Sequence, residues 1–267
     1  MPINKVFEKK IGLVLPGGGA RGAYQVGVLK AINEIKPDSN PFSIISGTSA
    51  GAINASLLAS RSESFKEAVE LLSGVWSNFR TNKVYRTDTA TMLKSSLQWL
   101  LTISSGGILV KNPKSLLDNS PLRHLLEEAI NIQDIQNNID KGNLDAFAIT
   151  AAGYSSKKSV TFFQSERDDI DWERFLRVGV KTDIEIDHLM ASIALPLIFP
   201  AVKINNEYFG DGAMRQATPL SPAIRLGAEK LLIITTDLKS HKNHLTDLSL
   251  IHISEPTRRT PISYAVF

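Results

Sequence analysis

Ser49 stands at the centre of the pentapeptide Gly-Thr-Ser-Ala-Gly, residues 47–51, between an apolar run and a segment with helical character. A serine in Gly-x-Ser-x-Gly at the turn from a strand into a helix is the form of a nucleophile elbow, in which the sharp turn exposes the hydroxyl. The pentapeptide alone arises by chance in about one chain in ten of this length. The prediction that Ser49 attacks an acyl group therefore depends on partner groups elsewhere in the chain.

A glycine-rich loop, Pro-Gly-Gly-Gly-Ala-Arg-Gly over residues 16–22, lies upstream, between an apolar run and a helical pattern. Consecutive glycines that open a helix can aim several backbone N–H groups at one point, where the helix dipole adds partial positive charge. Such a loop suits a phosphate, and it equally suits the oxyanion of a tetrahedral intermediate. The nucleotide-binding pattern Gly-x-x-x-x-Gly-Lys-Ser/Thr is absent.

Asp211 is the candidate acid, because it lies between two glycines after a predicted hairpin, where its carboxylate can reach out of the backbone. A triad needs a histidine after the acid in the α/β-hydrolase order, so His241, His244 and His252 qualify by order. They occupy a polar, irregular C-terminal segment without turn glycines beside them, and we interpret each as a surface histidine.

The elements that must position these groups begin with strand, glycine loop, helix, strand, elbow and helix, in that order. This opening predicts an α/β fold of three layers, α/β/α, with a mostly parallel central sheet. Ser120 is the expected N-cap of a helix that starts at Pro121, since its hydroxyl can accept from the first N–H groups. The predicted helices are 22–35, 52–60, 65–79, 121–130, 187–192 and 222–227, the predicted strands are 11–15, 42–46, 144–151, 160–164 and 230–235, and a hairpin is expected over 203–208.

The chain is expected to form a single catalytic domain over residues 8–240. Residues 80–120 form an irregular insertion with an apolar cluster at 92–103, which is either ordinary core or a lid or membrane-docking surface. The tail, 241–267, has no periodicity and is expected to be irregular.

Composition restricts the function further. The 267 residues include 43% hydrophobic and 21% charged residues, no cysteine, and a net charge of +3. This is a globular composition that excludes disulfides and thiolate nucleophiles and indicates neither a metal, a cofactor nor nucleic-acid binding. With no signal peptide and no long apolar run, we expect a cytoplasmic or peripheral membrane protein and leave secretion without a signal peptide open.

Together, these motifs resemble those of the patatin-like phospholipase family. The resemblance rests on Gly17–Gly22 as Gly-Gly-Gly-x-Arg-Gly, on Gly47–Gly51 as Gly-x-Ser-x-Gly, and on Asp211-Gly212-Ala213 as the Asp-Gly-Ala motif. It covers roughly residues 10–237 and also includes the segment Ala191–Pro200. Three motifs in the family's order are far more specific than any one of them.

The resemblance implies a Ser–Asp dyad without histidine that hydrolyses phospholipid or lysophospholipid esters through an acyl-enzyme. Ser49 would be the nucleophile, Asp211 the general base, and the N–H groups of Gly17, Gly18 and Gly19 the oxyanion hole. Arg21 would either position the loop or contact a substrate phosphate. The alternatives are an enzyme whose glycine loop binds a nucleotide or phosphorylated substrate, and a lipid-binding protein without turnover.

Overall fold

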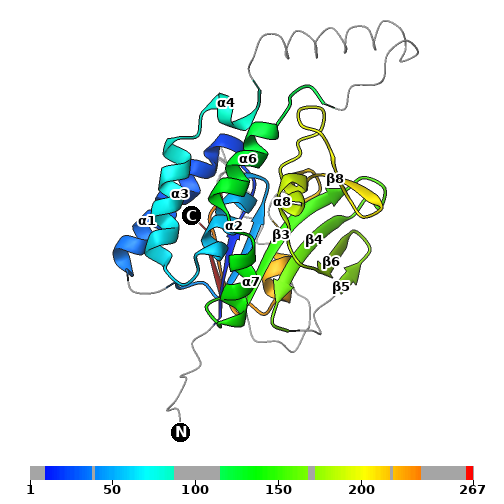
Figure 1. Ribbon diagram of the computed structural model, residues 1–267. Helices are drawn as coiled ribbons and strands as arrows, with labels where there is room; N and C mark the ends of the chain where they lie inside the picture. The colour runs from blue at the N-terminus through cyan, green and yellow to red at the C-terminus, as the bar shows by residue number, and fades with distance from the viewer. Residues whose placement is uncertain are drawn as a thin grey trace, which may run out of the picture.

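The computed structural model describes residues 10–37, 40–86, 115–167, 172–216, 219–235 and 263–266. The described strands form one mixed sheet in the order β10-β9-β1-β2-β3-β4-β6-β5, with β8 added to β3 and β7 to β8. Figure 1 shows helices grouped beside this sheet. The strands are β1 (Ile11–Leu15), β2 (Ile44–Thr48), β3 (Ala146–Gly153), β4 (Ser159–Ser165), β5 (Trp172–Arg174), β6 (Arg177–Lys181), β7 (Val202–Ile204), β8 (Glu207–Asp211), β9 (Lys230–Ile233) and β10 (Ser263–Val266).

The parallel half of the sheet confirms the predicted α/β class. β10, β9, β1, β2 and β3 are parallel neighbours, so their carboxyl ends share one edge. The helices are α1 (Gly22–Ile35), α2 (Ala50–Ser60), α3 (Phe65–Ser77), α4 (Thr81–Val84), α6 (Ser120–Ala129), α7 (Gln133–Asp140), α8 (Ile186–Ser192) and α9 (Ser221–Arg225).

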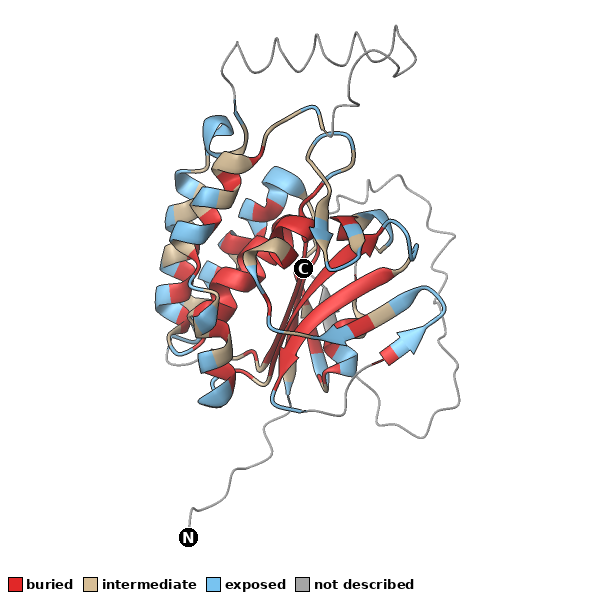
Figure 2. Ribbon diagram, turned by 45° about the vertical axis from the view of Figure 1, so that its right-hand side comes forward, coloured by how far each residue is buried: buried red, intermediate tan, exposed pale blue. Residues whose placement is uncertain are grey.

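Alternate residues of the central strands face two different hydrophobic cores, as strand geometry requires. Leu13 of β1 packs with α1, α2 and α3, whereas Val14 packs with α9 and with Trp172. Every residue of α2 is buried, which makes it the central helix of the molecule (Figure 2). Helices therefore lie on both faces of the sheet, although among the described residues only the short α9 packs against the inner strands on the second face.

The other half of the sheet is largely antiparallel. β3 and β4 form a hairpin, and β7 and β8 form the hairpin predicted over 203–208, which turns at Asn205-Asn206, where Asn205 has φ +52°. Asparagine tolerates this left-handed conformation better than most residues. β6 then runs parallel to β4, and β5 pairs antiparallel to β6.

Several boundaries differ from the prediction. β2 is displaced along the chain and includes Gly47 and Thr48, so the strand continues into the pentapeptide and ends at Thr48, directly before Ser49. The predicted N-cap at Ser120 is wrong, because α6 already begins at Ser120 and the N-cap position is taken by Asn119. The sequence patterns also missed the short α4, the mostly polar α7 and the β5–β6 hairpin.

Two predicted regions fall partly outside the described residues. Of the insertion at 80–120, the structure describes 80–86, which contain α4, and 115–120; the apolar cluster at 92–103 lies outside. Within the tail at 241–267, the structure describes only β10, which pairs with β9, so the expected irregularity is wrong for these four residues. β-Branched and aromatic residues such as Tyr264 and Val266 favour such a strand once an edge is available. No described helix is long and apolar enough to cross a membrane.

The central position of α2 predicts a large cost for shortening one of its side chains. Leu57 is fully buried, so Leu57→Ala is expected to lower the free energy of unfolding by about 2–5 kcal/mol, measured by denaturant titration. Ile35, at the end of α1, is 84% exposed, and Ile35→Ala is the matched control with an expected change within about 0.5 kcal/mol. Equal effects of the two substitutions would contradict the assignment of α2 as the core helix.

Candidate active site

The backbone at Ser49 is strained into a conformation that presents the side chain at the end of β2. Ser49 has φ +56° and ψ −129°, which a non-glycine residue rarely adopts. The flanking glycines are required by space: a Cβ on Gly51 would lie 2.0 Å from the carbonyl oxygen of Leu15, and one on Gly47 would lie 2.6 Å from the Cα of Ala52. Close packing of the turn against β1 and α2 thus explains both glycines of the pentapeptide.

The Ser49 hydroxyl donates a hydrogen bond to Asp211, with 2.6 Å between Oγ and Oδ2. β3 brings the two together. Its residue Thr150 pairs with Thr48 at the end of β2, and its next residue, Ala151, pairs with Asp211 at the end of β8. Because β4 occupies the other edge of β3, β2 and β8 follow one another along the same edge.

The Asp211 carboxylate is fully buried and held from several directions. Its Oδ1 accepts from the N–H of Ala213 at 2.8 Å, and its own N–H donates to the carbonyl of Ala194, also at 2.8 Å. Gly212 lies so close to β3 that a Cβ there would be 2.1 Å from the carbonyl oxygen of Thr150. One carboxylate oxygen is therefore fixed by the backbone while the other faces Ser49.

Burial raises the pKa of Asp211 above its ordinary value, and the hydrogen bonds from Ser49 and from the Ala213 N–H oppose this shift. A raised pKa makes the carboxylate a stronger base toward a hydroxyl. Tyr154 lies next to Asp211, since a Cβ on the preceding residue, Gly210, would lie 2.6 Å from the Oη of Tyr154. Burial and then the negative charge of Asp211 raise the pKa of Tyr154, so its phenol stays protonated.

The described histidines do not complete a triad with these residues. The His124 side chain is 75% exposed and lies near Glu127. His188 is buried, accepts the Glu185 N–H through Nδ1 and packs edge-on against the ring of Phe162. Burial lowers its pKa, which keeps the imidazole neutral. The three histidines considered from the sequence, His241, His244 and His252, lie outside the described residues.

Ser192, which the sequence did not single out, anchors the backbone of Ser49. The backbone N–H of Ser49 donates to Ser192 Oγ at 2.9 Å, and Ser192 donates in turn to the carbonyl of Thr150 at 2.7 Å. Ser192 is completely buried at the end of α8. The Ser49 amide is therefore bonded to the scaffold, and no pattern of spacing marks Ser192 for this role.

The glycine loop lies against the serine. A Cβ on Gly17 would be 3.0 Å from the Cβ of Ser49 and 3.6 Å from its Oγ, so Gly17 permits the closest approach. Gly18 is half-buried, and Gly19, with φ +56°, is exposed and begins a short 3₁₀ turn, Gly19–Arg21. Arg21 is exposed at the end of this turn. The structure thus brings Gly17 to Ser49, with Gly18 and Gly19 next along the same loop.

Two buried amide side chains tie both ends of this loop to the helices. Gln25 Nε2 donates to the carbonyls of Pro16 at 2.8 Å and Ile234 at 3.1 Å. Asn54 Nδ2 donates to the carbonyl of Gly22 at 3.0 Å and to Gln25 Oε1 at 2.9 Å. A trans peptide points its C=O and N–H in opposite directions, so holding the Pro16 carbonyl also sets the direction of the Gly17 N–H.

Trp76 of α3 completes this network. Its Nε1 donates to Asn54 Oδ1 at 2.6 Å, and its ring lies 2.8 Å from where a Cβ on Gly22 would stand. Gln25 and Asn54 are fully buried polar residues on otherwise apolar helix faces. A polar residue at an apolar position of a helical pattern is the sequence signal that could have marked these two residues. In the described residues, no group of three His, Cys, Asp or Glu side chains is placed to hold a metal ion.

Sequence comparison with known proteins connects this arrangement with a protein family. The family profile described as patatin-like phospholipase matches residues 13–224. Lysophospholipase nte1 of Aspergillus terreus is 55% identical over 56 residues, which are 21% of this chain and 4% of that protein. The patatin-like phospholipase domain-containing protein ZK370.4 of Caenorhabditis elegans is 44% identical over 68 residues, 26% of this chain and 5% of that protein. The chain therefore spans only a small part of these curated relatives.

Among solved structures, VipD from Legionella pneumophila has a TM-score of 0.46 at 16% identity, over 88% of this chain and 51% of that one. Human GIVD cytosolic phospholipase A2, in complex with methyl gamma-linolenyl fluorophosphonate, has a TM-score of 0.45 at 12% identity, over 85% and 40% of the two chains. The family profile spans both glycine-flanked motifs, the elbow around Ser49 and the loop around Asp211, and most of the described fold. On this match, the chain belongs to the patatin-like phospholipase family.

Proposed function

We propose that this protein is a serine esterase that hydrolyses acyl esters of phospholipids or lysophospholipids, with Ser49 as nucleophile and Asp211 as general base. The observation that carries the proposal is the 2.6 Å hydrogen bond from Ser49 Oγ to a buried carboxylate oxygen. A nucleophile within hydrogen-bond reach of a base, on a strained strand-to-helix turn, is an arrangement suited to covalent acyl transfer.

In the proposed reaction, Asp211 takes the hydroxyl proton as Ser49 Oγ attacks the ester carbonyl carbon. N–H groups of Gly17, Gly18 and Gly19 stabilise the oxyanion of the tetrahedral intermediate. The ester C–O bond breaks, the leaving alcohol takes the proton from Asp211, and an acyl-Ser49 ester remains. Water, deprotonated by Asp211, then attacks this ester and releases the fatty acid, which restores the serine hydroxyl.

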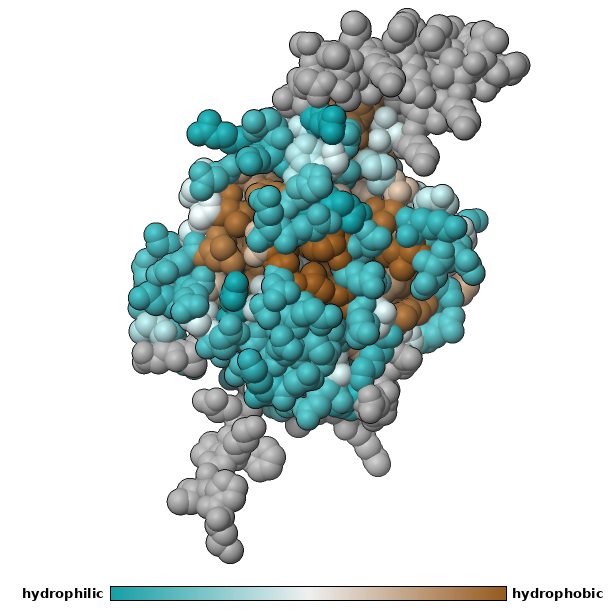
Figure 3. Space-filling view, viewed as in Figure 1, coloured by the Kyte–Doolittle hydropathy of each residue, from teal (hydrophilic) through white to brown (hydrophobic). Residues whose placement is uncertain are grey.

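Apolar residues beside the dyad support a lipid substrate. Leu195, Leu197 and Ile198 are partly exposed and follow directly after Ala194, whose carbonyl binds the Asp211 N–H. Met214, three positions after Asp211, is 50% exposed. Figure 3 shows apolar residues at several places across the middle of the molecule, with hydrophilic residues between and around them. An acyl chain would lose contact with water against such a surface.

The head group and the role of Arg21 belong to the same proposal. The fungal relatives are named lysophospholipases, which supports a phosphate-bearing lipid as the substrate class. Arg21 is exposed at the end of the glycine loop and would either contact the substrate phosphate or position the loop. Hydrolysis of a panel of phospholipids beside neutral glycerides by Arg21→Ala separates these roles, since only a phosphate contact changes the preference between the two classes.

The dyad predicts that Ser49→Ala and Asp211→Asn each reduce kcat for a short-chain p-nitrophenyl ester by at least about a thousandfold, because each removes one half of the nucleophile–base pair. Ser73→Ala is the matched control, since the Ser73 hydroxyl donates to the carbonyl of Val69 within its own helix, α3. A fluorophosphonate probe should label the wild type and the control but not Ser49→Ala. Full activity in either dyad variant would remove that residue from the mechanism.

The raised pKa of Asp211 predicts the acid side of the pH–rate profile. Asp211 acts as a base only when deprotonated, so kcat/KM should rise with pH and reach half of its plateau above the ordinary aspartate value of 3.8. The measurement is a pH profile with a soluble ester, in a range where the fold is shown to be intact. A midpoint at or below the ordinary value would contradict the role of the buried carboxylate.

The buried amide network predicts a positioning effect at a distance from the dyad. Trp76→Phe keeps a ring against Gly22 but removes the hydrogen bond to Asn54, so the glycine loop loses part of its restraint. We expect kcat to fall about three- to tenfold, the range that one hydrogen bond provides, with KM nearly unchanged. Trp172→Phe, in the core on the other face of the sheet, is the control. A loss of thermal stability without a change in kcat would make the network merely structural.

A further inference from the structure

The tip of the β5–β6 hairpin exposes two large apolar side chains between two arginines. The sequence over 172–177 is Trp-Glu-Arg-Phe-Leu-Arg, and the turn places Phe175 and Leu176 at its tip. Phe175 is 91% exposed and Leu176 is 56% exposed. Such adjacent apolar residues at a hairpin tip contribute nothing to the described core, so their hydrophobic area is available to a partner.

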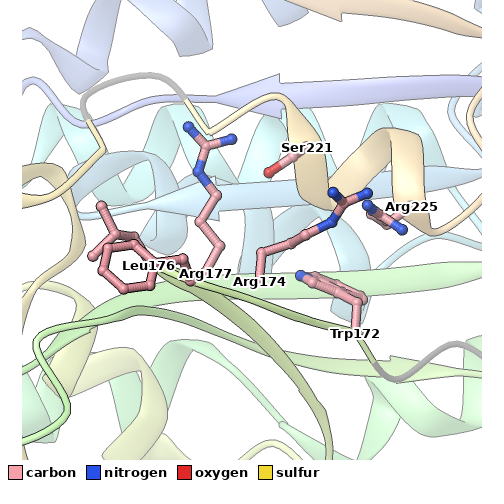
Figure 4. A pocket seen from close by; sticks show the side chains of 7 residues that line it. Trp172, Arg174, Leu176, Arg177, Ser221 and Arg225 are labelled. Carbon is pink, nitrogen blue, oxygen red and sulfur yellow. The ribbon is translucent and has the colours of Figure 1, made fainter.

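Three arginines line one pocket behind this tip. The pocket, of about 510 Å³, lies between the hairpin and α9 and is lined by Trp172, Arg174, Phe175, Leu176, Arg177, Ser221 and Arg225 (Figure 4). None of the described residues that line it is acidic. In the part of the chain that the structure describes, none of the three arginines forms an ion pair. The neighbouring Glu173 is paired with Lys158 at 2.5 Å.

These like charges repel one another in the absence of an anion. Guanidinium groups bind phosphate oxygens through paired hydrogen bonds, so an approaching phosphate would both relieve the repulsion and find suitable donors. The pocket is therefore complementary to a phosphate group in its charge and in its donors.

The hairpin tip lies at the edge of the sheet that also carries the dyad. Arg177, the first residue of β6, pairs with Ser159, which pairs with Ala152 near the carboxyl end of β3. Ser49 follows Thr48, which pairs with Thr150 two residues earlier in β3. The tip and the nucleophile are thus level along β3, separated laterally by the widths of β3 and β4.

We propose that Phe175 and Leu176, with Arg174, Arg177 and Arg225, form a docking surface for a bilayer that contains anionic phospholipids. The two apolar side chains enter the boundary between head groups and acyl chains, and the arginines contact the lipid phosphates. A free anion would use the arginines but would leave the apolar tip exposed, so the combination favours the bilayer. The purpose of this docking surface, which is to bring the dyad to lipid, rests on the proposed function. The test of the docking surface measures binding alone and does not depend on that function.

The test measures vesicle binding without hydrolysis, in the Ser49→Ala background. Binding is measured by co-sedimentation with two kinds of vesicle. One contains phosphatidylcholine with 30 mol% phosphatidylserine, which is roughly the composition of a charged membrane leaflet, and the other contains phosphatidylcholine alone. We expect stronger binding to the anionic vesicles, which weakens as salt is raised. Arg174→Gln, Arg177→Gln and Arg225→Gln should each weaken binding about fivefold, and the triple variant on the order of a hundredfold. Phe175→Ser should weaken it at least about tenfold on both vesicle types.

The matched control removes the same charge elsewhere. Lys30→Gln, Lys36→Gln and Lys66→Gln change three exposed residues of α1, its end and α3, and this triple variant should bind nearly as the parent does. Equal losses in the two triple variants would overturn the proposal in favour of non-specific attraction by net charge. Binding of inorganic phosphate to the arginines, measured by calorimetry, without vesicle binding would replace the membrane surface with a free-phosphate site.

A second arm separates this proposal from the proposed function. In protein that retains Ser49, the arginine variants should keep full activity on a soluble short-chain ester and lose activity only on vesicles. Activity absent on every ester, with vesicle binding intact, would contradict the hydrolase and leave the docking surface supported. Loss of soluble-ester activity in the arginine variants would contradict the docking role instead.

Discussion

The candidate site depends on the way in which β3 divides one of its edges between two strands. β2 occupies that edge as far as Thr150, and β8 takes it over from Ala151. The end of a parallel strand and the end of an antiparallel strand therefore meet at one point. Ser49 continues from the first and Asp211 ends the second, which explains how residues 162 positions apart come within 2.6 Å. The hydrogen bonds of Ser192 to Ser49 and Thr150 fix the same junction from the side of α8.

The junction is closed so tightly that glycine is required around it. Side chains at positions 17, 47, 51 and 212 would each meet atoms of the neighbouring strand, turn or helix, with the severest overlaps at Gly51 and Gly212. Burial of the carboxylate follows from this packing and raises the pKa of Asp211. Hydrogen bonds from the Ser49 hydroxyl and from the Ala213 N–H oppose this rise in the pKa, because both favour the charged carboxylate.

The glycine loop gains its shape from the helices and not from its own sequence. Free glycines are conformationally permissive, and an open loop of them would pay a large entropy cost to hold several N–H groups in one direction. Gln25 and Asn54 offset this cost by bonding the carbonyls at both ends of the loop, and Trp76 orients Asn54. Buried amides of this kind are stable only because each polar atom in the chain of contacts finds a partner.

The antiparallel half of the sheet differs in character from the half that carries the candidate site. β4, β6 and β5 extend the sheet away from the candidate dyad, and their last turn carries the exposed Phe175 and Leu176 with three arginines at the pocket behind them. An amphipathic, positively charged tip and an apolar surface around α8 thus lie toward one edge of one sheet. Because the same sheet carries both surfaces, it fixes the position of each relative to the other.

Local patterns were sufficient to predict the elements that carry the chemistry. The alternation of apolar runs with glycine clusters predicted the positions of β1, α1 and α2 closely, because the tight turns between these elements admit almost no residue but glycine. The predicted bounds of α1 agree with the observed helix residue for residue. The motifs around Ser49 and Asp211 likewise identified both members of the candidate dyad. The mostly polar α7 and the short β5–β6 hairpin escaped prediction, since neither has the length or apolar periodicity on which such prediction depends.

Only the tertiary structure decided which residues meet. No spacing in the chain indicates that Ser192 binds the Ser49 amide, that Gln25 and Asn54 hold the glycine loop, or that Arg225 joins Arg174 and Arg177 at one pocket. These contacts join segments far apart in the sequence, and their geometry depends on strand order and register. The sequence alone determined the residue types and the local turns of this protein, whereas the folded sheet determined their distances, their burial and the basicity of Asp211.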